Sequence, residues 1–155
     1  LAAHKGARFV ELIHRLGLSR DSLARTLEAA ATIGWVARNP GHGHPLRPEY
    51  ILTEAGAAAA ARAATISEAQ AAIDLPPGAA TRWGLPLVVG IGAGHDRFNA
   101  LSRLLTPATP RALSQGLTAL GKHGLVTREI LDMRPPASRY DLTQSGALLA
   151  AACTA

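Results

Sequence analysis

An internal repeat with a spacing of about 90 residues is the feature that most constrains how this chain can fold. Early in each copy the spacing is 89, and the matched pairs are Arg8 with Arg97, Phe9 with Phe98, Leu12 with Leu101, and Leu16 with Leu105. After a one-residue shift the spacing is 90, and the matched pairs are Leu23 with Leu113, Leu27 with Leu117, Gly34 with Gly124, Val36 with Val126, Arg38 with Arg128, Tyr50 with Tyr140, Leu52 with Leu142, Thr53 with Thr143, and Gly56 with Gly146. Matches that recur in order over most of the chain predict two related units in tandem.

A proline-rich segment between the two copies predicts where one unit ends and the next begins. The segment Leu75-Pro76-Pro77-Gly78 stops a helix and cannot continue one. We therefore predict a first unit at residues 1–75 and a second at 76–155. Only seven residues precede Arg8, so we expect the N-terminal helix of the first unit to be truncated.

Each copy begins with the pattern of a helix, a tight turn and a second helix. In the first copy four large apolar residues share one helical stripe that ends at a glycine: Phe9, Leu12, Ile13 and Leu16, followed by Gly17. Ser19 is then a suitable N-cap for a second helix, which Gly34 should end. In the second copy Thr109 takes the capping position, Pro110 the first helical position and Gly124 the stop.

A short hairpin and an alanine-rich helix complete each predicted unit. A β-branched run follows each glycine, and a loop rich in proline leads to Tyr50-Ile51-Leu52 or Tyr140-Asp141-Leu142. Thr53 and Thr143 then open alanine-rich segments, and alanine is the best helix former. The predicted fold class is mainly α, of the α+β kind, with two tandem winged helix-turn-helix units. In such units the hairpin is the wing, and the second helix of the turn enters the DNA major groove.

The charge balance favours polyanions as partners. The chain has 16 Lys+Arg against 11 Asp+Glu, a net charge of +5, and a pI near 10.3. Residues 1–75 have 8 basic and 7 acidic residues, whereas residues 76–155 have 8 and 4, so the halves carry +1 and +4. The second unit is therefore predicted to be the better phosphate binder.

Catalytic, metal and membrane functions find little support in the residues. A single cysteine, Cys153, excludes an internal disulfide and a multi-cysteine zinc site, and no nucleophile-base set is visible, so we expect neither an enzyme nor a cofactor. His42-Gly43-His44 lacks nearby ligands, and we expect no metal site there. With neither a membrane span nor a signal peptide in view, we expect a cytoplasmic protein.

The motifs of both copies resemble the HxlR-type winged helix regulators of the MarR-like superfamily. In the second copy these motifs are Arg97-Phe98-Asn99-x-Leu101, the Leu113-to-Gly124 helix with Leu125-Val126-x-Arg128, Pro135-Pro136, and Tyr140-x-Leu142-Thr143-x-x-Gly146, with Trp83 upstream. In the first copy they are Arg8-Phe9-Val10-Glu11-Leu12, Gly34-x-Val36-x-Arg38 and Pro48-Glu49-Tyr50-x-Leu52-Thr53. Two departures are Ala100, where the family has an acidic residue, and the alanine run Ala29-Ala30-Ala31 in the first recognition helix.

The resemblance implies a bacterial DNA-binding transcription regulator that contacts double-stranded DNA, and we expect it to act as a repressor. Members are usually single units that dimerise on a palindromic operator, so two units in one chain imply a covalent pseudo-dimer on half-sites about one helical turn apart. A homodimer of tandems is the alternative, and the alanine run leaves open whether the first unit still binds DNA.

Polar residues opposite the leucine stripes and basic residues on the wings are the candidate DNA contacts, because arginine and glutamine read base edges and hydroxyls reach phosphates. An ordinary solvated helix face is the alternative interpretation. The candidates are Arg20, Arg25, Arg38 and Arg47 in the first unit, and Arg111, Ser114, Gln115, Thr118, Arg128, Arg134 and Arg139 in the second. Asp21 and Glu28 share the polar side of the first recognition helix and are expected to face the bases with Arg20 and Arg25.

Two other function classes are compatible with the sequence. One is a sensor or sequestering resistance protein that binds a small apolar effector in a pocket between the units, with Trp35 and Trp83 as walls. Both tryptophans are more simply explained as core residues. The other class is a protein-interaction module, since fold alone does not fix function.

Overall fold

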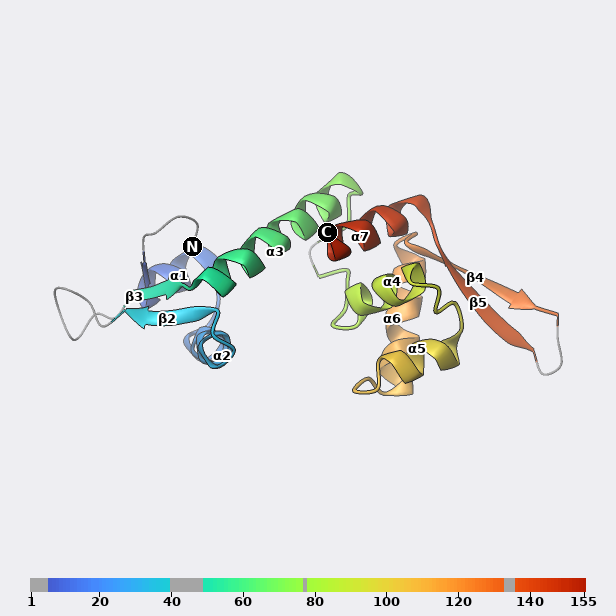
Figure 1. Cartoon of the computed structure of the whole chain (residues 1–155), viewed down its shortest axis with the longest axis horizontal. Coiled ribbons are helices and arrows are strands. Elements are labelled where there is room, and N and C mark those ends of the chain that lie inside the picture. Colours follow the sequence, from blue (N-terminus) through green and yellow to red (C-terminus); the bar gives the residue numbers. More distant parts are fainter. Residues whose placement is uncertain (1–5, 40–48, 77, 133–135) are drawn as a thin grey trace. The chain divides into compact units, whose positions relative to one another are not determined.

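The chain consists of two compact units in a computed structural model that describes residues 6–39, 49–76, 78–132 and 136–155 (Figure 1). The units are Leu1–Ala61 and Arg62–Ala155, so the division falls inside the long helix α3 (Glu54–Ala72). Its C-terminal half groups with the second unit because Ile66 and Ala69, together with Ile73 just after the helix, pack against that unit's core. The boundary that the repeat suggests, after residue 75, stays a prediction.

The first unit is built on a three-stranded antiparallel sheet with strand order β1-β3-β2. Its elements are β1 (Ala7–Arg8), α1 (Phe9–Leu16), α2 (Arg20–Thr32), β2 (Val36–Asn39), β3 (Glu49–Leu52) and the start of α3. In the register of the hairpin Val36 lies opposite Leu52, and Arg38 lies opposite Tyr50. The buried core is small and consists of Ala7, Leu12, Leu23, Leu27 and Val36.

The second unit contains four helices of its own and a two-stranded sheet. Its elements are α4 (Gly84–Gly92), α5 (Phe98–Leu104), α6 (Pro110–Lys122), β4 (Val126–Leu131), β5 (Ala137–Leu142) and α7 (Gln144–Thr154). The strands β4 and β5 form the wing hairpin, and a single bridge joins Arg97 to Arg139 beside it. Both units thus contain two consecutive helices, a hairpin and a further helix in the predicted order, and the second unit adds α4 before them.

The predicted caps and stops define the helix-turn-helix segments. The side-chain oxygens of Ser19 and Thr109 accept hydrogen bonds of 3.2 Å from the backbone amides of Ser22 and Ala112, at the starts of α2 and α6. Gly34 and Gly124 end these helices with φ of 75° and 66°, a conformation that glycine adopts without the steric cost of a Cβ. The capping and stop predictions are confirmed.

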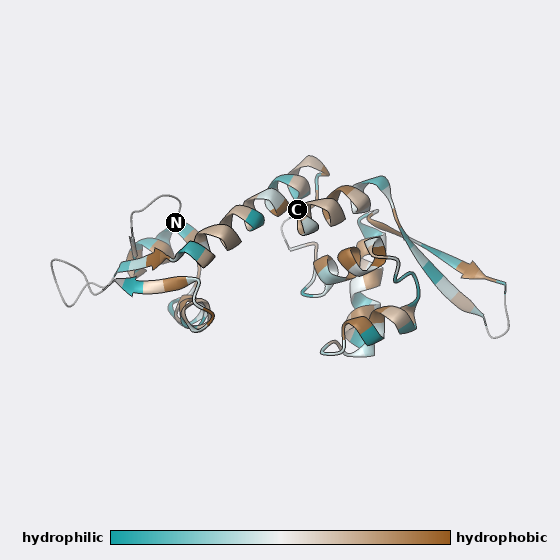
Figure 2. Cartoon of the chain, viewed as in Figure 1, coloured by the Kyte–Doolittle hydropathy of each residue, from teal (hydrophilic) through white to brown (hydrophobic). Residues whose placement is uncertain are grey.

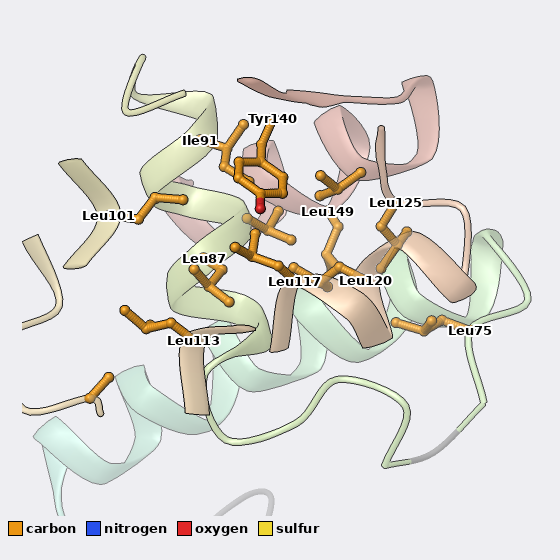
Figure 3. Packing of buried hydrophobic residues seen from close by; sticks show 13 residues of the cluster. Leu75, Leu87, Ile91, Leu101, Leu113, Leu117, Leu120, Leu125, Tyr140 and Leu149 are labelled. Atoms are coloured by element: carbon orange, nitrogen blue, oxygen red, sulfur yellow. The ribbon is translucent and has the colours of Figure 1, made fainter. Parts of the chain in front are cut away.

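The core of the second unit forms where α4 packs against α6 and α7. Figure 3 shows leucines of several elements converging there, and α4 is mostly hydrophobic (Figure 2). Leu87, Leu101, Leu113 and Leu149 are fully buried, and each such burial contributes about 1.5–3 kcal/mol to folding. A Cβ at Gly116 would lie 2.7 Å from Leu87 Cδ1, so glycine at this position permits α4 to lie close to α6.

The described residues contain no helix that is long and apolar enough to cross a membrane.

Candidate nucleic-acid interface

One side of α6 presents a polar stripe directly opposite its buried stripe. Arg111, Gln115, Thr118 and Lys122 recur at intervals of four, three and four residues, and all are exposed. The opposite side carries Leu113, Gly116, Leu117 and Leu120, all of which are buried. The predicted exposure of Arg111, Ser114, Gln115 and Thr118 is therefore confirmed. Lys122 was missing from the predicted set, although its position four residues after Thr118 places it on the same stripe.

The wing of the second unit has two chemically different faces. Val126, Arg128 and Ile130 on β4 lie opposite Leu142, Tyr140 and Ser138 on β5, and side chains of directly paired residues share one face of the sheet. Val126 and Tyr140 are buried, so this face packs toward the core and α6. Arg128 lies on the same face but remains exposed, and its Nε donates a 2.9 Å hydrogen bond to Ser138 Oγ.

A recess of about 330 Å³ lies where this wing face meets α6. The helix contributes Ser114, Leu117, Thr118 and Gly121 to its walls, and the wing contributes Val126, Arg128 and Tyr140. Three residues of the predicted site, Ser114, Thr118 and Arg128, thus come together around one recess, although the wing arginine is ten residues or more from the helix residues along the chain. Tyr140 was not among the predicted site residues, and no spacing in the sequence indicated its place beside them.

Arg139 lies on the other face of the wing and is held by two carboxylates. Its Nη2 donates to Glu129 Oε2 at 2.7 Å, and its Nε donates to Asp141 Oδ2 at 3.1 Å. Glu129 is its cross-strand neighbour, and Asp141 is two residues further along β5 on the same face. Since these carboxylates offset its charge and Arg128 lies on the opposite face, Arg139 does not join the group around the recess.

The first unit places its predicted residues on matching elements with different surroundings. Arg20 and Arg25 are exposed on α2, and Arg25 Nε donates to the backbone oxygen of Asp21 at 3.3 Å. Arg38 is exposed on β2, opposite Tyr50. The remaining wing candidates, Arg47 and Arg134, lie outside the described residues.

The two tryptophans differ in their surroundings. Trp35 is 46% exposed, so the interpretation of this residue as core is wrong. It follows α2 at the position where the second unit has the buried Leu125, and the described part of the first unit holds a smaller core. Trp83 is partly buried against the core of the second unit, with the Arg82 guanidinium 5.5 Å from its ring centroid. The ligand site that these tryptophans would line stays a prediction.

The described residues contain no group of three or more potential metal-ligating side chains. His42 and His44, the pair considered in the sequence, lie outside them. Cys153 is partly buried near the end of α7, and this burial raises the pKa of its thiol.

Comparisons with known proteins identify a family model and several relatives. Residues 79–155 match the model of the HxlR-like helix-turn-helix family. The chain is 33% identical over 66 residues to the uncharacterized HTH-type transcriptional regulator YtfH of Escherichia coli K12, and the same values hold for YtfH of Shigella flexneri. That alignment covers 43% of this chain and 52% of the relative, so the chain spans about half the length of the curated relatives it matches.

Among solved structures, the chain is similar to a MarR-family transcriptional regulator from Enterococcus faecalis V583. The identity is 28% and the TM-score 0.45, with 66% of this chain and 81% of that chain covered. It is also similar to diamide-treated YodB of Bacillus subtilis, with 23% identity and a TM-score of 0.44, over 55% of this chain and 81% of that one.

Proposed function

Because residues 79–155 match the model of the HxlR-like helix-turn-helix family, we propose that this chain is a transcriptional regulator that binds double-stranded DNA through its second unit. The observation that carries the proposal is the polar stripe of α6 next to the recess that Arg128 shares with Ser114 and Thr118. One surface thereby combines a helix of the kind that enters a major groove with a wing cation beside it.

The side chains of this surface fit the two tasks of DNA recognition. Arg111 and Gln115 carry forked donors that match the edges of guanine and adenine, so they are the proposed base-reading residues. Ser114, Thr118, Arg128 and Lys122 are suited to phosphate oxygens, which fix the position of a protein on the duplex. Arg111 and Lys122 are the ionisable side chains of α6, so no carboxylate on this helix opposes the approach of DNA.

Binding of the complete chain to DNA fragments from its own upstream region tests the proposal. We expect tight binding that resists unrelated competitor DNA and weakens steeply as salt rises. The variant with both Arg111→Ala and Gln115→Ala should lose the preference over unrelated DNA, whereas Leu148→Ala, which trims an exposed leucine of α7, should retain it. Equal affinity of the unaltered chain for operator and unrelated fragments would exclude sequence-specific regulation.

We further propose that the two winged units form a covalent pseudo-dimer that represses transcription; the shared order of their elements supports the tandem arrangement. On this proposal a single chain supplies both units, and sedimentation of the full chain should give a monomer. A sedimenting dimer would instead support a homodimer of tandems. A reporter gene behind the bound fragment should be expressed less when the protein is present, and higher expression would show activation.

A second candidate function is the binding of a small apolar effector, which an apolar recess within the second unit favours. This recess holds about 390 Å³ between α4 and α7, with Val89, Leu142 and Ala150 among its walls, and its size lies within the range of about 300–1,000 Å³ typical of ligand sites. An environment-sensitive apolar dye should bind the full chain and be excluded by Ala150→Phe, which fills the recess. Unchanged dye binding in that variant would place the dye elsewhere.

A further inference from the structure

The helices α2 and α6 correspond residue by residue. Each has 13 residues, and the bounds Arg20–Thr32 and Pro110–Lys122 differ by 90 in number. Both begin at a capping hydroxyl that accepts a 3.2 Å hydrogen bond from the third residue beyond it. Leu23 and Leu27 are buried at the positions of Leu113 and Leu117, so the exposed faces of the two helices also correspond.

The chemistry of these corresponding faces differs. The second helix of the first unit has two basic side chains and two carboxylates, whereas α6 has two basic side chains and none. The corresponding positions are Arg20 and Pro110, Asp21 and Arg111, Ala24 and Ser114, Arg25 and Gln115, Glu28 and Thr118, and Thr32 and Lys122. All of these residues are exposed. The helix geometry is therefore the same in both units, while the groups that would face DNA are not.

Two of these differences act directly against contact with DNA. Asp21 stands in the first turn of α2, and a recognition helix contacts base edges with its N-terminal residues. Glu28 lies seven residues later on the same side of the helix, where the second unit has the uncharged Thr118. Both carboxylates would enter a groove bordered by phosphates, where a negative charge is repelled and where the favoured base partner of a carboxylate is the amino group of cytosine.

Resting on the proposed function, we propose that recognition is asymmetric within the covalent pseudo-dimer: the second unit alone reads bases, so a single chain reads the sequence of only one half-site. The first unit keeps the cap, the buried leucines and the hairpin of a winged unit, but its α2 stays out of the major groove. Operator specificity then depends on α6, and the first unit does not contribute to base reading.

Two variants with equal charge changes test this asymmetry in the full chain. One carries Arg111→Ala and Lys122→Ala on α6, and the other carries Arg20→Ala and Arg25→Ala on α2. Fluorescence anisotropy with the upstream DNA fragment should show an affinity loss of roughly 5- to 150-fold for the α6 variant, as expected for loss of a base-reading arginine. The α2 variant should stay within about twofold of the unaltered chain, and circular dichroism checks that both variants fold.

A third variant replaces the acidic residues of α2 by their counterparts, as Asp21→Arg with Glu28→Thr. Unchanged or higher affinity supports the proposal, because it shows that the carboxylates make no favourable contact with DNA. A loss of affinity in this variant, or an α2 loss equal to the α6 loss, overturns the asymmetry while leaving DNA binding intact. Failure of the unaltered chain to prefer its own fragment would instead count against the proposed function itself.

Discussion

The hydroxyl of Thr143 donates a 2.6 Å hydrogen bond to the backbone oxygen of Gly124, which lies 19 residues earlier in the chain, at the base of the wing. The same hydroxyl oxygen accepts a 3.1 Å bond from the amide of Gly146, so it caps α7 and holds the turn that ends α6. In the first unit Thr53 makes the equivalent bonds to Gly34 at 2.6 Å and from Gly56 at 3.0 Å. One side chain therefore ties the recognition helix, the base of the wing and the following helix together in each unit.

Replacing Thr143 by valine should destabilise the second unit. The substitution keeps the shape of the side chain but removes both hydrogen bonds, and loss of an N-cap costs about 0.5–2 kcal/mol. Urea denaturation followed by circular dichroism measures the change. Thr127→Val serves as control, since Thr127 makes one exposed 3.3 Å bond, and it should change the free energy of unfolding by less than about 0.5 kcal/mol. Equal losses in the two variants would contradict the capping role.

The pair Gly146→Ala and Gly121→Ala should change stability in opposite directions. A Cβ at Gly146 would lie 2.0 Å from the backbone oxygen of Leu125, which cannot rotate away, so we expect a loss of about 1–3 kcal/mol. At Gly121 the nearest atom is the Val126 oxygen at 3.7 Å, so alanine should stabilise α6 by up to about 1 kcal/mol. Thermal unfolding gives the melting temperature of each variant. An unchanged melting temperature of the Gly146→Ala protein would show that α7 lies further from the backbone of Leu125.

Removing Arg128 should weaken binding to every DNA sequence by a similar factor. Its place beside Ser114 and Thr118 suits a phosphate contact, which carries no sequence information. The plot of log affinity against log salt concentration has a negative slope, and its magnitude should decrease by about 0.9 if one phosphate contact is lost. Filter binding or anisotropy at several salt concentrations gives the slope. A loss confined to the operator would indicate base reading by Arg128 instead.

Removing Arg139 should weaken DNA binding only while its two carboxylate partners are present. Without the arginine, Glu129 and Asp141 are left as uncompensated negative charges on the wing. We therefore expect Arg139→Ala to lower affinity in the unaltered chain and to have no effect when Glu129→Gln and Asp141→Asn are also present. Such a cycle separates coupled from independent effects, and the same loss in both backgrounds would show that Arg139 contacts DNA directly.

Cys153 should react slowly with alkylating reagents in the folded chain. Burial raises the pKa of its thiol above the ordinary value of 9.0, so at pH 7–8 the reactive thiolate is rarer than in an unfolded chain. The rate should rise with pH, and the difference between folded and urea-unfolded protein should narrow as pH passes the folded pKa. Mass spectrometry of iodoacetamide adducts measures both rates, and faster labelling of the folded chain would contradict the prediction.

Much of the local structure was predictable because it follows from short-range chemistry. The hydroxyls of Ser19 and Thr109, the left-handed glycines at 34 and 124, and the leucine stripes each act within a few residues. The same periodicity predicted which α6 side chains are exposed. The exposure of Trp35 was not predictable, because burial depends on which other elements are present to cover a residue, and a tryptophan after a helix stop is equally suited to a core.

The sequence by itself determined the helix-turn-helix segments, their caps and stops, the hairpins and the polar stripe of α6, since spacing and local hydrogen bonding suffice for these features. Only the tertiary structure decided that Arg128 and Arg139 lie on opposite faces of the wing. The register pairs Arg128 with Tyr140 and Arg139 with Glu129, and adjacent residues of a strand project to opposite faces. That register places Arg128 with Ser114 and Thr118, and it leaves Arg139 between Glu129 and Asp141. Strand pairing therefore decides that Arg128, and not Arg139, joins the candidate DNA surface.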